Sequence, residues 1–272
     1  MFFVFGSPRS GTTLLKEVLN LNTKIYILNE TDFVDLTAQV IHNIDDPVQG
    51  KEIIYKIIIN SNLRSSLTKF LTNEKIYGLV HESEYNFFDI IDSLYQEVLK
   101  CTGAEVVGDK SPNYLSGVNF FEHIGLFDKD IKFIHIVRDL RDVLLSLKRM
   151  SWCPKDLSLF SETWARTNLK LSKLGLSHPE KYFFMKYEDF ILDPEPILYK
   201  SCDFLGVKYD ASMMNWGSCK KEIHDLNSHK NIGLPPLVHK VGNWRYELVN
   251  EPKLLDDASP ANNALKFYDY GD

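Results

Sequence analysis

Residues 2–15 read Phe2-Phe3-Val4-Phe5-Gly6-Ser7-Pro8-Arg9-Ser10-Gly11-Thr12-Thr13-Leu14-Leu15. The first four of these residues favour a β-strand and carry no polar break, as expected for a strand buried on both faces of a parallel sheet. Gly6 and Gly11 bracket a turn in which a backbone without Cβ atoms bends tightly and presents its N–H groups to an anion. A helix that begins at about Thr12 directs the positive end of its dipole to the same place. The stretch therefore predicts a phosphate-binding loop between a buried strand and a helix.

The ligand of this loop is indicated by a missing lysine. The glycine spacing matches the nucleoside-triphosphate P-loop, G-x-x-x-x-G-K-[ST], except that Thr12 stands at the lysine position. That lysine neutralises the β- and γ-phosphates during phosphoryl transfer, so its absence disfavours a triphosphate. Arg9 inside the loop offers a planar fork that suits a smaller anion gripped from the side. Loop geometry alone leaves two alternatives, a degenerate P-loop kinase and a loop that only turns a corner.

The run Ser7-Pro8-Arg9-Ser10-Gly11-Thr12-Thr13-Leu14-Leu15 resembles the 5′-phosphosulfate loop of sulfotransferases that use 3′-phosphoadenosine 5′-phosphosulfate (PAPS). The resemblance is to the membrane-associated type, which includes tyrosylprotein, carbohydrate and related bacterial enzymes. It implies PAPS as the cosubstrate. The donor-binding residues that it implies in the loop are Ser7, Pro8, Arg9, Ser10, Gly11, Thr12 and Thr13.

Composition and charge are those of an ordinary globular chain of 272 residues, 44% hydrophobic and 25% charged, which we expect to form a single sulfotransferase domain over 1–272. The net charge of -6 and the lack of a long Lys/Arg run argue against a nucleic-acid surface. Four widely spaced cysteines without a C-x-x-C pair predict reduced, mostly buried thiols. Without a signal peptide or a stretch long enough to span a bilayer, we expect a soluble, cytoplasmic protein.

A second strand is expected over Lys24–Leu28, followed by the helix-capping signature Asn29-Glu30-Thr31-Asp32. A carboxylate at the carboxyl end of a strand lies on the edge where open α/β sheets bind ligands. From the residues alone, Glu30 fits a general base and a helix-terminus charge equally well. In the tyrosylprotein enzymes a Glu-Thr pair follows the loop arginine at the same interval and the Glu is the base. The resemblance therefore implies that Glu30 is the catalytic base.

The segment Ala104–Tyr114 predicts another strand and a proline-containing turn, with Lys110 at the carboxyl edge. A lysine there would stabilise negative charge on the transferring group or on the bridging oxygen. The alternative is an ordinary solvated surface lysine. Asp-Lys-Ser-Pro resembles the lysine-containing turn after the second strand of this superfamily, which implies that Lys110 is catalytic.

The clearest strand is expected over Ile131–Val137, and the run from Arg138 to Ser146 comes directly after it, with Asp139 as a helix cap. Arg138 and Ser146 would form a second anion clamp, unless Arg138 pairs with Asp142 on the helix surface. The pattern Arg-Asp-x-Arg-Asp-x-x-x-Ser resembles the sulfotransferase motif in which the Arg and the Ser hold the 3′-phosphate. Two phosphate motifs on two strands fit a 3′,5′-bisphosphorylated adenosine, whereas a kinase has no need of the second.

Two further donor contacts are implied near the end of the chain. After the expected strand Tyr182–Lys186, Tyr187-Glu188-Asp189-Phe190 resembles the family's Tyr-Glu-Asp-Leu segment, whose tyrosine often lies near the nucleotide. In the tyrosylprotein enzymes a serine that contacts the donor precedes a Lys-Trp pair by the interval that separates Ser228 from Trp244. The family's lysine is Asn243 here, so cationic charge would come from Lys240 or Arg245.

Four other features carry less specific signals. The segment Tyr77–Asn86 has no clear period, and we expect a substrate-facing loop in which His81 and Glu84 are candidates for acceptor contact. His135 alternates with isoleucines, which predicts a packed core histidine. Trp164 fits either the core or an aromatic platform near the adenine. The histidines show no metal-ligand spacing.

Strands separated by helical segments predict a P-loop-like, three-layer α/β fold with a mainly parallel central sheet flanked by helices. The predicted function is transfer of a sulfuryl group from PAPS to a hydroxyl or amine of an acceptor, with no metal. Glu30 would take the acceptor proton, while Arg9, Lys110 and Ser228 stabilise the negative charge. The alternatives are a P-loop kinase-like phosphotransferase and a non-catalytic nucleotide-binding module. The acceptor stays open among protein tyrosine, sugar, lipid and small metabolite.

Overall fold

Five short strands form one parallel sheet in the order β2-β3-β1-β4-β5. The computed structural model describes residues 1–29, 33–60, 67–110, 115, 117–123, 125, 129–219 and 233–271. The strands are β1 (Phe2–Phe5), β2 (Ile25–Asn29), β3 (Val106–Lys110), β4 (Lys132–Val137) and β5 (Tyr182–Lys186). All four residues of β1 are buried, because this strand has a neighbour on each side and helices on each face. The predicted strands and the parallel sheet are confirmed.

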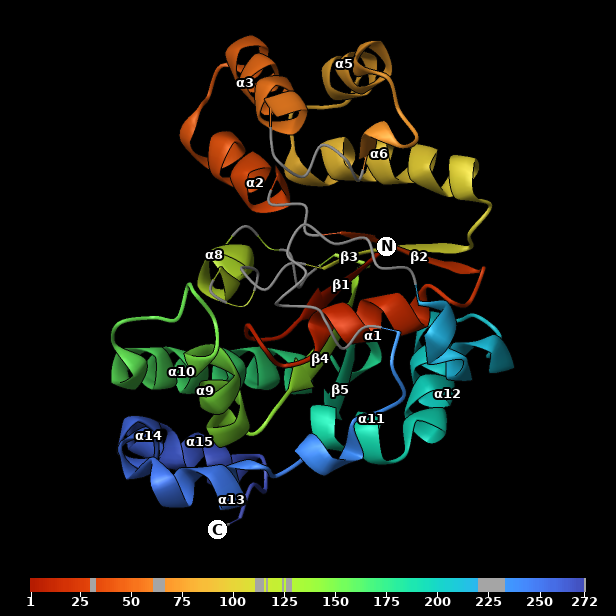
Figure 1. Cartoon of the computed structure of the whole chain (residues 1–272). Helices are drawn as coiled ribbons and strands as arrows, with labels where there is room; N and C mark the ends of the chain where they lie inside the picture. The colour runs from red at the N-terminus through yellow and green to blue at the C-terminus, as the bar shows by residue number, and fades with distance from the viewer. Residues whose placement is uncertain are drawn as a thin grey trace.

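Helices cover both faces of the sheet, and alternate residues of β1 pack against different helices (Figure 1). Phe3 and Phe5 belong to a buried cluster with α2, α3, α5 and α6, which lie together above the sheet in Figure 1. Phe2 and Val4 pack on the other face with α1, α11 and α12. The helices are α1 (Thr12–Leu19), α2 (Phe33–Asn43), α3 (Pro47–Asn60), α5 (Asn73–Glu82), α6 (Phe87–Thr102), α8 (Val118–His123), α9 (Leu140–Lys148), α10 (Leu157–Ser177), α11 (Tyr187–Leu192), α12 (Pro194–Leu205), α13 (Trp244–Glu247), α14 (Pro252–Ala258) and α15 (Asn262–Phe267).

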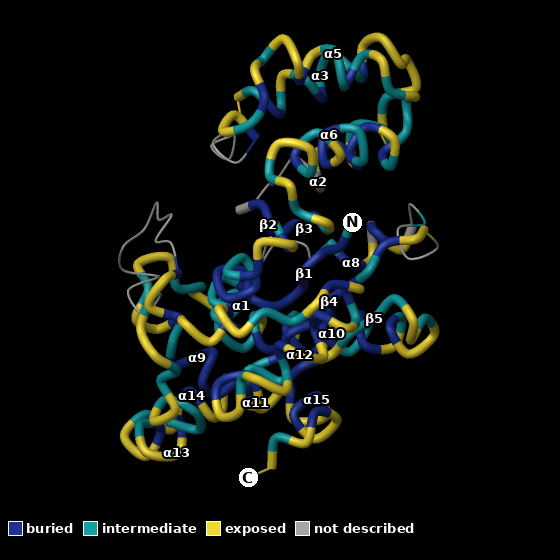
Figure 2. The backbone as a smooth tube through the Cα atoms, turned by 90° about the vertical axis from the view of Figure 1, so that its right-hand side faces the viewer, coloured by how far each residue is buried: buried dark blue, intermediate teal, exposed yellow. Residues whose placement is uncertain are grey.

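A third buried cluster joins α9 and α10 to the C-terminal helices α13, α14 and α15. Trp164 lies in this cluster, 2% exposed, with its ring edge-on to that of Tyr268. Of the two interpretations of Trp164, the structure therefore supports the core residue. Figure 2 shows β1, at the centre of the sheet, as buried, and most exposed residues on the outer sides of the helices. Among the described residues, no helix has both the length and the apolar character needed to cross a bilayer.

One predicted loop is a helix. Most of the segment Tyr77–Asn86 belongs to α5, which Thr72 caps by accepting a hydrogen bond from the Lys75 N–H. Ile76 and Val80 bury one side of this helix. The His81 ring stacks on Tyr77 at a centroid distance of 3.8 Å. The prediction of a substrate-facing loop is therefore wrong. The apolar period of the helix was hidden because Tyr77 and His81 interrupt the run of apolar residues.

The predicted thiol state is confirmed and the predicted burial is only partly right. All four cysteines are free. Cys202 and Cys219 are buried, whereas Cys153 is intermediate and Cys101 is exposed.

His135 is a core residue of β4, as predicted, and is fully buried. Its Nε2 lies 2.8 Å from Oδ1 of Asn168, which can only accept, so this nitrogen carries the proton. Its Nδ1 lies 2.7 Å from the hydroxyl oxygen of Tyr182 and therefore accepts. Both ring nitrogens are thus satisfied by a neutral imidazole.

We predict a loss of stability in acid that depends on His135. Burial lowers the pKa of His135 from 6.5 to about 4. As the pH falls from 6.5 toward 4, the unfolded chain takes up a proton that the folded chain does not, so the free energy of unfolding falls. The contribution is on the order of 3 kcal/mol. Urea unfolding across this pH range, compared between wild type and His135→Gln, measures it, and equal pH slopes would contradict the assignment.

Candidate active site

The loop after β1 is held in shape by two serines. Ser7 and Ser10 are buried with their hydroxyl oxygens 2.6 Å apart, and the Ser10 N–H donates to the Ser7 carbonyl oxygen at 3.1 Å. Helix α1 begins at Thr12, and Gly11 before it provides no side-chain cap. The first N–H groups of α1 therefore lie at the loop without a side-chain cap, where the helix dipole favours an anion.

Gly11 and Arg9 both adopt left-handed backbone angles, with φ of 89° and 70°. A Cβ atom on Gly11 would lie 2.5 Å from Cδ2 of Tyr187, the first residue of α11. Only glycine fits there, because the loop approaches the tyrosine ring closely. For Arg9 the same backbone region costs about 1–2 kcal/mol. Tyr187 therefore lies against the loop, where the resemblance placed a residue near the nucleotide.

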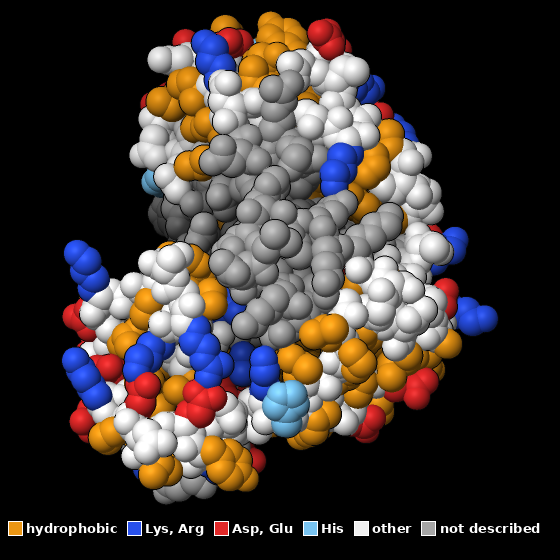
Figure 3. Space-filling view, viewed as in Figure 1, with side chains coloured by type: hydrophobic (Ala, Val, Ile, Leu, Met, Phe, Trp, Pro, Cys, Tyr) orange, Lys and Arg blue, Asp and Glu red, His pale blue; other side chains and the backbone are white. Residues whose placement is uncertain are grey.

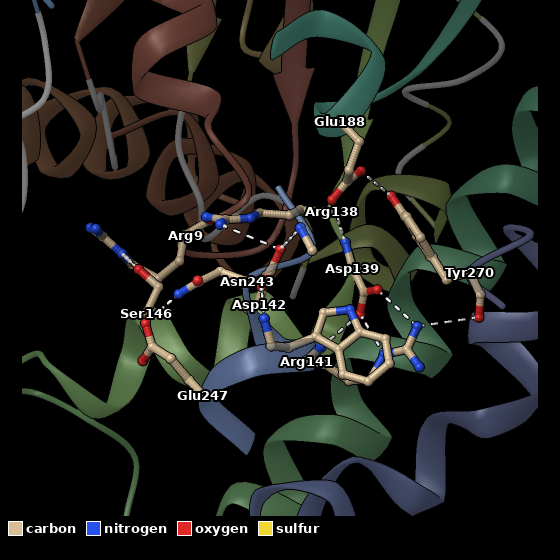
Figure 4. Close-up of polar contacts among 12 residues, drawn as sticks. Arg9, Arg138, Asp139, Arg141, Asp142, Ser146, Glu188, Asn243, Glu247 and Tyr270 are labelled. Atoms are coloured by element: carbon tan, nitrogen blue, oxygen red, sulfur yellow. Dashed lines mark hydrogen bonds and ion pairs between the residues drawn. The ribbon is translucent and has the colours of Figure 1, made fainter. Parts of the chain in front are cut away.

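The two predicted phosphate motifs are in direct contact (Figure 4). Nε of Arg9 donates to Oγ of Ser146 on α9 at 2.9 Å. Nη1 of Arg138 donates to the Arg9 carbonyl oxygen at 3.1 Å, which holds the left-handed Arg9 backbone in place. These contacts form because β1 and β4 are neighbours and their carboxyl ends meet at one edge of the sheet.

Arg138 does pair with Asp142, the alternative that the residues allowed, but the two side chains are largely buried and do not lie on the helix surface. Its Nη2 lies 3.9 Å from Oδ2 of Asp142, a long contact between two shielded groups. Its guanidinium carbon lies 4.4 Å from the centre of the Tyr187 ring. Nε of Arg138 is buried and has no hydrogen-bond partner among the described residues. This donor suits an anionic ligand, because burying a polar group without a partner is costly.

Asp139 and Asp142 organise the start of α9. Asp139 is the predicted cap and accepts the Arg141 N–H at 2.9 Å, while its carboxylate also pairs with the Arg141 guanidinium. Asp142 accepts the N–H groups of Gly242 and Trp244, both at 2.9 Å, and thereby fixes the start of α13 beside the Arg138 motif. Burial raises the pKa of Asp142, and the neighbouring Arg138 opposes that shift. From the sequence, Asp142 was considered only as an ion-pair partner of Arg138, and its hydrogen bonds to Gly242 and Trp244 were not predicted.

Trp244 lies in the same region, in the buried cluster of α9 and the C-terminal helices, and two arginines contact its ring. Its ring packs between the guanidinium carbons of Arg141, at 3.6 Å from the ring centre, and Arg245, at 4.4 Å. Its side chain is buried, and its Nε1 has no hydrogen-bond partner within the described part of the chain. Asp142 connects Trp244 to the clamp, so this predicted donor contact lies next to the site.

Lys110 ends β3, the other neighbour of β1, and is fully buried. The surface-lysine alternative is therefore wrong. Its Nζ donates to Oγ1 of Thr13 in the first turn of α1, at 3.2 Å. The loop after β1 lies between two cations, Lys110 at the end of β3 and Arg138 directly after β4, which together would stabilise an anion.

Two predicted catalytic residues, Glu30 and Ser228, lie outside the described residues. Strand β2 ends at Asn29, which is paired in register with Lys110. Figure 3 shows Lys and Arg side chains gathered over α9, interspersed with acidic ones. Lys148 and Arg149, at the end of α9, pair with Glu251 and Glu247.

The Sulfotransferase family profile matches residues 2–211, well over half of the chain, so the chain belongs to this family and is a sulfotransferase. Sulfotransferase 2A2 of Rattus norvegicus is 22% identical to it over 225 residues, which cover 77% of this chain and 71% of the rat protein.

Two solved structures share the fold. The sulfotransferase domain of the Synechococcus PCC 7002 olefin synthase has a TM-score of 0.65 at 23% identity and covers 90% of this chain and 86% of that domain. The sulfotransferase domain from the curacin biosynthetic pathway has a TM-score of 0.57 at 19% identity and covers 92% of this chain and 97% of that domain. The predicted P-loop-like α/β fold is confirmed.

Proposed function

We propose that this chain transfers a sulfuryl group from PAPS to a hydroxyl or amine of an acceptor. The observation that carries the proposal is the contact between the two phosphate motifs, made by Arg9 with Ser146 and by Arg138 with the Arg9 carbonyl. A loop for one phosphate beside a clamp for a second suits an adenosine with separate 5′- and 3′-phosphates. A nucleoside triphosphate, with its phosphates in one row, uses only the loop.

The described residues fit such a donor. The uncapped N-terminus of α1 and the Arg9 guanidinium would hold the 5′-phosphosulfate. Arg138, whose buried Nε has no hydrogen-bond partner in the described part of the chain, and the Ser146 hydroxyl would hold the 3′-phosphate. The Tyr187 ring lies against both the loop and Arg138, which supports a role for it in contacting the nucleotide.

When bound, PAPS supplies a sulfuryl group activated by its phosphate leaving group. Lys110, oriented by Thr13, and Arg9 would stabilise the negative charge that develops between the sulfuryl oxygens and the departing phosphate. Glu30 is the proposed base that removes the acceptor proton, and Ser228 is a proposed further hydrogen-bond donor. Because a sulfuryl group carries less charge than a phosphoryl group, these protein cations suffice for the proposed reaction.

Calorimetric titration with adenosine 3′,5′-bisphosphate and with ADP, each with and without magnesium, tests the proposal. We expect metal-independent binding of the bisphosphate that weakens by roughly thirtyfold in Arg138→Ala, through loss of a charge-assisted fork. Arg166→Ala, which removes an exposed arginine of α10, is the matched control and leaves the affinity unchanged. Preference for magnesium-ADP would overturn the proposal in favour of a kinase. Bisphosphate binding that is insensitive to Arg138→Ala would exclude Arg138 from the proposed 3′-phosphate site.

A further inference from the structure

The turn that carries Arg138 is held by two side chains from distant parts of the chain (Figure 4). The Asp139 N–H, in the peptide group after Arg138, donates to Oε1 of Glu188 at 3.0 Å. The Val137 carbonyl oxygen, in the peptide group before Arg138, lies 3.1 Å from the hydroxyl oxygen of Tyr270. Both peptide groups of Arg138 are therefore fixed from outside the turn.

The two holding side chains also bind each other. The hydroxyl oxygen of Tyr270 lies 2.7 Å from Oε2 of Glu188, so its single proton is shared between that carboxylate and the Val137 carbonyl. Both Glu188 oxygens take part, since Oε1 accepts from the Asp139 N–H and Oε2 contacts the Tyr270 hydroxyl. The pair thus forms one connected network with the turn, and removal of either member leaves buried polar groups without partners.

Both members of the pair are themselves anchored. Glu188 follows Tyr187 on α11, and the Tyr187 ring stacks on the Arg138 guanidinium, so adjacent residues hold the backbone and the side chain of Arg138. Tyr270 lies under Nζ of Lys186, 4.9 Å from the ring centre. The next residue, Gly271, accepts a hydrogen bond from Nη2 of Arg141 at 2.7 Å.

We propose that Glu188 and Tyr270 are positioning residues for the 3′-phosphate subsite, which act by fixing the backbone on both sides of Arg138. The inference rests on the proposed function and assigns part of the donor site to the C-terminal residues. A guanidinium lies at the end of a long side chain, so a small tilt of the backbone moves it far from a phosphate oxygen. Misplacement by about 1 Å is enough to cost one to two orders of magnitude in a positioned interaction.

The test compares adenosine 3′,5′-bisphosphate with 5′-AMP, which lacks the 3′-phosphate, by calorimetry. For Tyr270→Phe we expect the Kd of the bisphosphate to rise about tenfold while that of AMP changes less than about twofold. Glu188→Gln keeps one acceptor for the Asp139 N–H, so its loss is smaller than that of Glu188→Ala. Tyr246→Phe, at a tyrosine 77% exposed, is the matched control and leaves both affinities unchanged.

The outcomes separate a positioning role from a structural one. Equal weakening of the bisphosphate and of AMP in both Tyr270→Phe and Glu188→Gln would overturn the inference, because general loosening does not select the 3′-phosphate. In the Arg138→Ala background, Tyr270→Phe should add no further loss, since both changes act through one group. If wild type prefers the bisphosphate and Tyr270→Phe keeps that preference, this inference alone fails. If wild type does not bind the bisphosphate, the proposed function fails and the inference with it.

Discussion

Replacement of Lys110 by methionine lowers turnover by about a hundredfold or more and leaves donor affinity within about threefold of wild type. The side chain is fully buried, and its Nζ is held against the first turn of α1 by Thr13. A positive charge fixed in this way interacts most strongly with the charge that develops as the sulfuryl group leaves the phosphate. Its removal therefore affects the transition state more than the bound donor. Turnover is measured as release of adenosine 3′,5′-bisphosphate from PAPS in the presence of phenol, alcohol and amine acceptors.

Lys132→Met is the matched control for this prediction. Lys132 lies in the same sheet but at the amino end of β4, where its Nζ donates to the Phe204 carbonyl oxygen. Loss of this lysine should leave turnover unchanged, because it lies at the edge opposite the loop. Unchanged turnover in Lys110→Met would exclude Lys110 from the mechanism. Donor binding without transfer by wild type to any acceptor would favour the non-catalytic binding module.

The fold followed from local patterns because the central strand β1 and its neighbour β4 are short, mostly apolar runs that are buried on both faces. Phe2–Phe5 and Ile131–Val137 are such runs, and each is followed at once by a polar motif. In a parallel sheet the carboxyl ends of the strands share one edge, so motifs at successive strand ends are expected to meet. The structure shows two such meetings: Arg138 contacts the loop after β1, and Lys110 contacts Thr13.

The parts that sequence reasoning missed depend on tertiary packing. Glu188 lies on α11 and Tyr270 follows α15, and neither has a sequence spacing from Arg138 that marks it as a support of that residue. Asp142 was visible only as a charge four residues after Arg138, and its two N–H donors belong to the segment before α13 and to its first residue. The missed helix α5 is different, because Thr72 followed by Glu74 is an N-terminal signal that could have found it.

Gly11→Ala should lower the free energy of unfolding by about 2–4 kcal/mol and weaken bisphosphate binding about a hundredfold. Two costs add at this position. The backbone φ of 89° is unfavourable for alanine, and the new Cβ would lie 2.5 Å from Cδ2 and 2.7 Å from Cε2 of Tyr187. The ring must then move away from the loop, and its stacking on Arg138 is lost. The substitution therefore disturbs the loop and the 3′-phosphate clamp together, which urea unfolding and calorimetry measure.

Gly103→Ala separates these two costs. Gly103, at the end of α6, has a φ of 70°, and a Cβ atom there would have no heavy atom of the described chain within 4 Å beyond its immediate neighbours. The variant carries the backbone cost alone, about 1 kcal/mol, and should leave donor affinity unchanged. The difference between the two variants then measures the contact with Tyr187. If Gly11→Ala matches Gly103→Ala in stability and binds the bisphosphate as wild type does, the ring does not press on the loop, and Tyr187 cannot be the element that joins the two phosphate subsites.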